Sequence, residues 1–216
     1  MHHRPLLKLC GNHSEHDVKV ALASSAEYIG FVFAKSKRQV CREQLKRWLP
    51  NEKNHKKIVA LFVNESIENI QYVLESAHVD VIQCHGNETP KYMNDLRKQV
   101  KQSLWKVIHH NDHALETMQS YRGIVDGYVV DCKVDRQWGG TGLSFDWNYV
   151  PQYVEEGHRQ GVKVWIAGGV NPSNIHKLLP YKPDGVDLSS GIEHEGKKSL
   201  ELVRQLEERM KRNDTR

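Results

Sequence analysis

A repeating rhythm constrains the fold of this chain more than any single motif. A short β-branched or aromatic run, a polar break and a longer segment of helical periodicity follow one another eight times. The runs that favour strands are residues 6–10, 28–33, 57–63, 79–85, 104–110, 125–131, 162–168 and 184–190. Amphipathic segments such as 66–77 and 172–179 separate them. Such alternation predicts parallel strands joined by helical crossovers.

Eight such units in 216 residues match the number and minimum length of a (β/α)8 TIM barrel. The expected fold class is therefore α/β. We expect residues 1–216 to form a single domain, because α/β barrels of this size routinely fold as one unit. A doubly wound sheet is the alternative, but no G-x-G-x-x-G motif follows the first predicted strand.

Composition and charge exclude several classes of partner. Lysine and arginine number 31 and aspartate and glutamate 27, so the net charge of +4 indicates no nucleic-acid partner but suits an anionic metabolite. No apolar stretch approaches the length of a signal peptide or a membrane span, so we expect no membrane association. The four cysteines have no C-x-x-C pair, which favours reduced thiols in a cytoplasmic protein: Cys10, Cys41, Cys84 and Cys132.

The predicted strand ends nominate the functional site, because active sites of TIM barrels lie at the C-terminal ends of the strands. Asp131 ends an apolar strand and precedes a glycine loop through Gly140 that is suited to a small anionic ligand. Two more glycine loops follow the seventh and eighth strands, where such barrels commonly hold a phosphate on main-chain N–H groups. The remaining candidates are Cys10, Ser36, Arg38, Gln83, His85, Gly168, Gly169, Ser189, Ser190 and Gly191.

Each of these residues also has a purely structural interpretation. A lone cysteine at a strand end, such as Cys10, is often a small buried hydrophobe. Asp131 is also compatible with a turn cap or a lysine partner, and Arg38 with a solvated basic loop. His85 either orients a substrate or is a hydrogen-bonded core histidine. Cys84 alternates to the opposite side of its strand, toward the helices.

Aromatic residues and histidines outside these strand ends are assigned to packing and to the surface. Trp105 and Trp165 are expected to pack in the core rather than to form a stacking platform. His109, His110 and His113 lie close together, but no carboxylate or cysteine stands beside them at ligand spacing. We therefore interpret them as surface histidines rather than as a metal site.

The motifs at the strand ends resemble those of the phosphoribosylanthranilate isomerase family, the (β/α)8 enzymes of tryptophan biosynthesis. The resemblance runs almost end to end. It rests on KLCG at 8–11, GFVFAKSKR at 30–38, FVNE at 62–65, QCHG at 83–86, VVD at 129–131, GGTGLSFDW at 139–147, IAGGVNPSNI at 166–175 and GVDLSSGIE at 185–193.

The resemblance implies an Amadori rearrangement of a phosphosugar substrate, N-(5'-phosphoribosyl)anthranilate, without a cofactor or a metal. It implies that Cys10 is the general base, Asp131 the general acid and Arg38 the partner of the anthranilate carboxylate. The phosphate is expected on main-chain donors of the two late glycine loops, Gly169 and 189–191. We expect these loops and nearby helix N-termini to lower the pKa of the Cys10 thiol.

Departures from the family pattern fall beside the site rather than on it. Asn12, Lys37, Leu143 and Ser199 stand where the family usually has other residues. Two other functions stay open: a different phosphosugar isomerase, epimerase or synthase on the same barrel, and a catalytically silent ligand-binding barrel. The sequence leaves the oligomeric state open.

Overall fold

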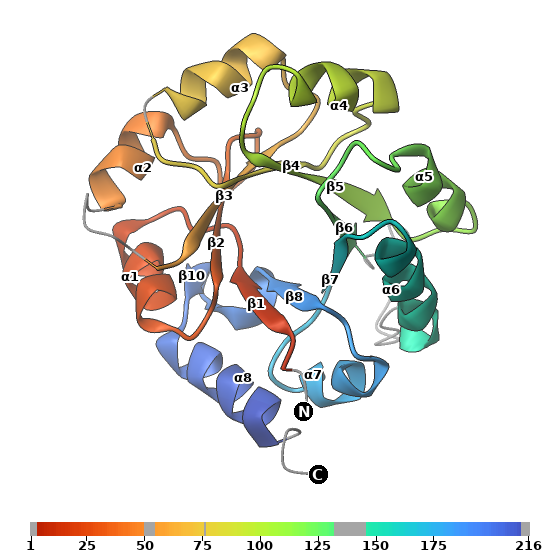
Figure 1. Ribbon diagram of the computed structural model, residues 1–216. Helices are drawn as coiled ribbons and strands as arrows, with labels where there is room; N and C mark the ends of the chain where they lie inside the picture. Colours follow the sequence, from red (N-terminus) through yellow and green to blue (C-terminus); the bar gives the residue numbers. More distant parts are fainter. Residues whose placement is uncertain (1–3, 50–54, 76, 132–145, 213–216) are drawn as a thin grey trace.

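All eight predicted strands are present in the computed structural model, where each pairs in parallel with the next and β8 closes on β1 (Figure 1). The structure describes residues 4–49, 55–75, 77–131 and 146–212. The strands are β1 (Leu6–Leu9), β2 (Tyr28–Val32), β3 (Lys57–Phe62), β4 (Val81–Cys84), β5 (Ser103–His109), β6 (Gly127–Asp131), β7 (Lys163–Ala167) and β8 (Gly185–Leu188). The TIM-barrel prediction is confirmed, and the doubly wound alternative is wrong.

Eight α-helices among the described residues surround the barrel (Figure 1). They are α1 (Glu15–Ala23), α2 (Arg42–Trp48), α3 (Ile67–Leu74), α4 (Pro90–Arg97), α5 (Ala114–Ser120), α6 (Val150–Arg159), α7 (Ile175–Leu178) and α8 (Leu200–Arg212). Ser14, Ser66 and Thr89 begin α1, α3 and α4 by accepting a hydrogen bond from the main-chain N–H three residues later. Within the described ranges, no helix has the length and apolarity needed to span a membrane.

Seven of the eight strands end before the predicted runs do, whereas β6 ends at Asp131 as predicted. The chain nevertheless continues its pairing beyond some of the strand ends. The N–H of Cys10 donates to the carbonyl of Leu188 at 2.7 Å, although β1 ends at Leu9. In the same way, the N–H of His85 donates to Phe62 at 2.8 Å, just after β4. Both side chains are therefore held at the C-terminal end of the barrel, where the sequence placed them.

Tightly packed aromatic side chains fill one half of the barrel interior. The ring centroids of Trp105 and Trp165 lie 3.9 Å apart, and Tyr28 lies 5.0 Å and 5.6 Å from them. A Cβ at Gly185 would lie 2.2 Å from the Trp165 ring, so only glycine fits there. Both tryptophans thus pack as predicted. Cys84 is fully buried among the apolar side chains that lie between the strands and the helices. This confirms the prediction that it points toward the helices and away from the barrel interior.

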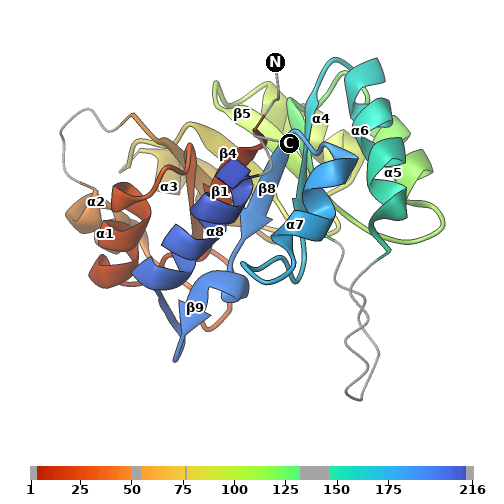
Figure 2. The ribbon, with the colours of Figure 1, turned by 90° about the horizontal axis from the view of Figure 1, so that it is seen from below.

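The other half of the interior is charged, and it lies toward the C-terminal ends of the strands. The register of the closing pair places Lys8 of β1 opposite Asp187 of β8. A hairpin of β9 (Glu193–His194) and β10 (Lys197–Lys198) follows β8. Figure 2 shows β9 at the end of the barrel opposite to where α8 ends. The aromatic half of the interior thus forms a packed end of the barrel, and the charged half forms a polar end.

Candidate active site

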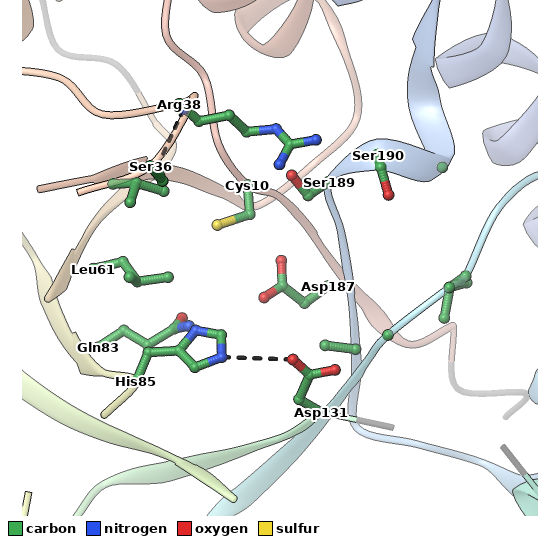
Figure 3. Close-up of a pocket in the computed structure, with 16 residues that line it drawn as sticks. Cys10, Ser36, Arg38, Leu61, Gln83, His85, Asp131, Asp187, Ser189 and Ser190 are labelled. Carbon is green, nitrogen blue, oxygen red and sulfur yellow. Dashed lines mark hydrogen bonds and ion pairs between the residues drawn. The ribbon is translucent and has the colours of Figure 1, made fainter. Parts of the chain in front are cut away.

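A cavity of about 320 Å³ opens at the polar end of the barrel (Figure 3). It brings together every predicted site residue except Gly140, which lies outside the described residues. Its walls consist of Cys10, Val32, Ser36, Arg38, Leu61, Gln83, His85, Asp131, Ala167, Gly168, Gly169, Val170, Asp187, Ser189, Ser190 and Gly191. Strand ends that are far apart in the sequence thus converge on one space.

The Cys10 thiol is buried at 6% exposure, and its sulfur points into this cavity (Figure 3). Burial raises its pKa above the ordinary value, because a thiolate loses hydration there. The ammonium groups of Lys8 and Lys198 oppose this rise, whereas the Asp187 carboxylate adds to it. The expectation of a lowered thiol pKa is therefore wrong: burial outweighs the neighbouring positive charge.

Lys8 and Asp187 form a buried ion pair beneath the thiol. Lys8 Nζ donates to Asp187 Oδ2 at 2.7 Å, and the two side chains are 0% and 7% exposed. Burial alone would lower the pKa of Lys8, but the attraction of Asp187 raises it above its ordinary value. Sequence reasoning missed this pair. The available signal was the alternation of the strands, since Lys8 and Asp187 stand two residues before Cys10 and Ser189 and share their face.

Asp131 and His85 meet on another side of the cavity (Figure 3). His85 Nε2 lies 3.5 Å from Asp131 Oδ2, and the side chains are 28% and 18% exposed. Because His85 lines the cavity, the substrate-orienting interpretation is favoured over a core histidine. Gln83 also lines the cavity, and neither Nε2 nor Oε1 of its side-chain amide hydrogen-bonds to any described residue. A buried amide without protein partners is suited to a ligand.

The predicted surface histidines have different environments. His113 is exposed and pairs with Glu116, whereas the ring of His110 hydrogen-bonds to the Tyr153 hydroxyl at 2.6 Å. His109 lies opposite Asp131 in the β5–β6 register, and its ring centroid is 5.5 Å from that of His85. The prediction that no carboxylate stands beside His109 is therefore wrong, because the pairing of β5 with β6 places Asp131 next to it.

Arg38 is held by a second charged network at the rim of the cavity. Its Nε and Nη2 donate to the two carboxylate oxygens of Glu193 at 2.8 Å and 2.6 Å. Lys198 Nζ donates to the same carboxylate at 2.8 Å and to the carbonyl of Ser189 at 3.0 Å. Burial would raise the pKa of Glu193, but Arg38 and Lys198 lower it to about 2. The solvated-loop interpretation of Arg38 is wrong, and Glu193 and Lys198 were missed.

The glycine loops after β7 and β8 pack against each other. Gly168 and Gly169 adopt φ angles of 91° and 73°, which favour glycine. A Cβ at Gly191 would lie 1.9 Å from the carbonyl oxygen of Val170. The main chain of the loop after β8 therefore packs directly against the main chain of the loop after β7. This contact aligns two segments of backbone along one wall of the cavity.

Two of the departures from the family pattern have clear local roles. The Asn12 amide is buried and donates to the carbonyls of Leu9 and Gly30 at 2.9 Å and 3.0 Å, which ties the loop after Cys10 to β2. The Ser199 hydroxyl accepts from the N–H of Leu202 at 3.3 Å at the start of α8. Lys37 is exposed, and Leu143 lies outside the described residues.

Comparison with known families agrees with this geometry. The model of the N-(5'-phosphoribosyl)anthranilate isomerase family matches residues 7–209. The chain belongs to this family. A member from Geobacillus thermodenitrificans is 52% identical over 206 residues, covering 95% of this chain and 93% of the relative. One from Halalkalibacterium halodurans is 51% identical and covers 98% of each chain.

Solved structures of phosphoribosylanthranilate isomerases share the fold. The enzyme from Thermotoga maritima superposes with a TM-score of 0.81 at 27% identity, covering 96% of this chain and 98% of its own. Another structure of such an isomerase, with a TM-score of 0.78 and 26% identity, contains reduced 1-(o-carboxyphenylamino)-1-deoxyribulose 5-phosphate. It covers 96% of this chain and 98% of its own. The isomerase family and the TIM-barrel fold are thus supported by independent comparisons.

Proposed function

We propose that Cys10 and Asp131 are the proton-transfer pair of the Amadori rearrangement that is the reaction of this family. N-(5'-phosphoribosyl)anthranilate becomes 1-(2-carboxyphenylamino)-1-deoxyribulose 5-phosphate, a step of tryptophan biosynthesis. One observation carries the assignment. A thiol that follows β1 and a carboxylate that ends β6 line one cavity whose wall also contains two glycine loops. The cavity thus combines a base, an acid and a phosphate-binding wall.

The two groups act at successive steps. Protonated Asp131 donates its proton to the furanose ring oxygen, the bond from that oxygen to C1 breaks, and the nitrogen lone pair forms a Schiff base. The positive nitrogen acidifies the proton on C2, which the Cys10 thiolate removes. The released electron pair forms a C1–C2 double bond and neutralises the nitrogen. The resulting enol-amine tautomerises to the ketose product.

Lys8 supplies the charge that makes a buried thiolate attainable. Among the groups that act on Cys10, Lys8 is the strongest that favours the ionised form. Asp187 keeps Lys8 protonated, because its carboxylate pairs with the ammonium at 2.7 Å. Lys8 is thus a positioning residue that acts through Cys10. The charged half of the barrel interior therefore acts on the proposed base, Cys10, and does not contribute to apolar packing.

Different groups bind the substrate's two anionic ends in this proposal. Arg38 binds the anthranilate carboxylate through its outer guanidinium edge, since the Nε edge is held by Glu193. The phosphate binds main-chain N–H groups of the glycine loops, at Gly169, Ser189, Ser190 and Gly191. The last two begin the short 3-10 helix η3 (Ser190–Ile192), and N–H groups in a first turn have no intrahelical acceptor.

The decisive experiment follows the loss of anthranilate fluorescence when purified protein meets substrate generated in situ. Cys10→Ala and Asp131→Asn are measured beside the parent. Loss of either proton-transfer group is expected to lower kcat by about 10²-fold to 10⁴-fold. Binding of the reduced product analogue serves as the control, because a folded variant retains its carboxylate and phosphate contacts.

Near-normal turnover of either variant would remove that residue from the mechanism. A parent that binds the analogue but turns over no substrate would instead favour the silent barrel. Conversion of a different phosphosugar would favour the related isomerase or synthase.

We also propose that residues 1–216 act as one domain in the cytoplasm, without a nucleic-acid partner. The described residues form one closed barrel. Cys10, Cys41 and Cys84 are free thiols, which suits a reducing compartment. Mass spectrometry after thiol alkylation without a reductant checks the redox state, and a disulfide-linked chain would contradict it.

A further inference from the structure

Three potential metal ligands meet at the polar end of the barrel. One atom each from His85, His109 and Asp131 lies within 4.8 Å of the others. His85 Nε2 and Asp131 Oδ2 lie 3.5 Å apart. Two ligands at bond lengths of about 2.1 Å in a tetrahedral site lie about 3.4 Å apart. This edge therefore already has the length that a bound zinc ion requires.

Strand alternation explains why these groups share one face. In β5, Trp105 and Val107 point into the barrel, and His109 follows with the same parity. In β6, Val129 points inward, and Asp131 follows two residues later. His85 follows the inward Gln83 at the end of β4. Three adjacent strands thus present one ligand each at the same level of the barrel.

The donor set selects a class of cation. Two imidazoles and one carboxylate are the ligands of open zinc sites, in which a water or a substrate atom takes the fourth position. Imidazole nitrogen favours first-row transition metals over Mg²⁺ or Ca²⁺, which prefer oxygen ligands. The side chains of His85 and Asp131 are 28% and 18% exposed, so a cation reaches them from solvent.

We propose that His85, His109 and Asp131 form a binding site for a divalent transition-metal cation such as Zn²⁺, and that this cation inhibits the isomerase. The cation is an inhibitor and not a cofactor. A carboxylate that ligates zinc has no proton to donate, so occupancy removes the general acid. The inhibition rests on the proposed role of Asp131, whereas the binding itself does not.

Zinc binding is measured first, by calorimetric titration of the full-length protein with ZnCl2. The informative variant is His109→Gln, because His109 has no role in the proposed reaction. The matched control is His113→Gln, which removes an exposed histidine that pairs with Glu116 outside the cluster. The parent and the control are expected to bind one equivalent. His109→Gln is expected to bind at least about tenfold more weakly, since loss of even an outer-shell partner costs that much.

The titration is repeated with Cys10→Ala and with a saturating amount of the reduced product analogue. Zinc binding is expected to survive the loss of the thiol and to be lost when the analogue fills the cavity. Binding that is equal in parent and His109→Gln, or that disappears in Cys10→Ala, would overturn the three-ligand site. Absence of binding to the parent would overturn it as well.

Turnover provides the second readout. In a metal-free buffer, His109→Gln is expected to match the parent. Added Zn²⁺ is expected to abolish parental turnover, with EDTA restoring it, and at least a tenfold higher concentration is expected to be needed for His109→Gln. Equal zinc sensitivity of the two proteins would refute the inhibitory site. Should the parent have no turnover at all, the binding titration still decides the metal site by itself.

Discussion

The two halves of the barrel interior are built from different chemistry. At the end where the strands begin, Tyr28, Trp105 and Trp165 pack with aliphatic side chains. At the end where the strands finish, the interior holds the ion pair of Lys8 and Asp187. Burial of the aromatic rings stabilises the fold directly. Buried ion pairs contribute little net stability, because desolvation offsets their attraction.

The packed half thus stabilises the closed barrel, whereas the charged half surrounds the Cys10 thiol. A chain under selection for stability alone would gain from apolar side chains in both halves. The charged half is accounted for by the thiol that it surrounds and by the anions that its cavity is expected to bind. Substitutions in the two halves should therefore have separable effects on unfolding and on catalysis.

Lys8→Met should give the largest effect, because it disturbs both properties. The variant leaves the Asp187 carboxylate buried without its partner, which is expected to cost about 3–5 kcal/mol of unfolding free energy. It also removes the charge that favours the Cys10 thiolate, so the rise of kcat/KM with pH should move to higher pH. Urea unfolding and a pH profile measure the two effects.

The double variant Lys8→Met/Asp187→Leu is the matched control. It removes both charges, so most of the unfolding free energy should return. The pH midpoint should stay above that of the parent, because the effect of Lys8 on Cys10 exceeds that of Asp187. An unshifted midpoint in both variants would contradict the role of Lys8.

Trp165→Ala tests the packed half. Removal of this ring from the stack with Trp105 should cost about 3–5 kcal/mol of unfolding free energy. The kcat of the folded fraction should match the parent, because the ring belongs to the core cluster and not to the cavity wall. A large fall in kcat measured well below the unfolding temperature would show that the halves are coupled.

Arg38→Lys should act mainly on substrate binding. Lysine cannot reproduce the two-pronged guanidinium contacts, and loss of one charged hydrogen bond is worth about 1.5–3 kcal/mol. We expect KM to rise roughly tenfold to a hundredfold, with a small change in kcat. Steady-state kinetics measure both constants, and an unchanged KM would refute the proposed carboxylate contact.

The smallest effect concerns acid stability. The folded-state pKa of Glu193 is about 2, below its ordinary value of 4.5. Its ionised form therefore stabilises the fold above pH 4.5, and this contribution fades as the pH falls toward 2. Glu193→Gln should flatten the fall of the melting temperature across that window. A parallel pH dependence in parent and variant would contradict the assignment.

Sequence reasoning located the residues that line the cavity, because strand alternation is local. Cys10, Gln83, His85 and Asp131 were placed at strand ends from the pattern of their own segments, and all four line the cavity. The family resemblance supplied their proposed roles. Residues whose position depends only on their own strand could thus be placed before the fold was known.

Residue pairs that depend on how distant strands align could not be predicted in this way. Lys8 and Asp187 are separated by 179 positions, and only closure of the barrel pairs them. The same holds for His109 and Asp131, which the β5–β6 register brings together. The β9–β10 hairpin, which carries Glu193 and Lys198, was not foreseen, because the predictions passed directly from the last strand to the last helix.

The closing pair of strands also has a consequence for synthesis of the chain. Lys8 is synthesised well before its partner Asp187, which lies 179 positions later in the last strand of the barrel. A nascent chain that ends before β8 contains Cys10, Asp131 and Arg38, yet lacks the carboxylate that pairs with the Lys8 ammonium. In the proposed mechanism, full reactivity therefore arises only after β8 has been synthesised and has paired with β1.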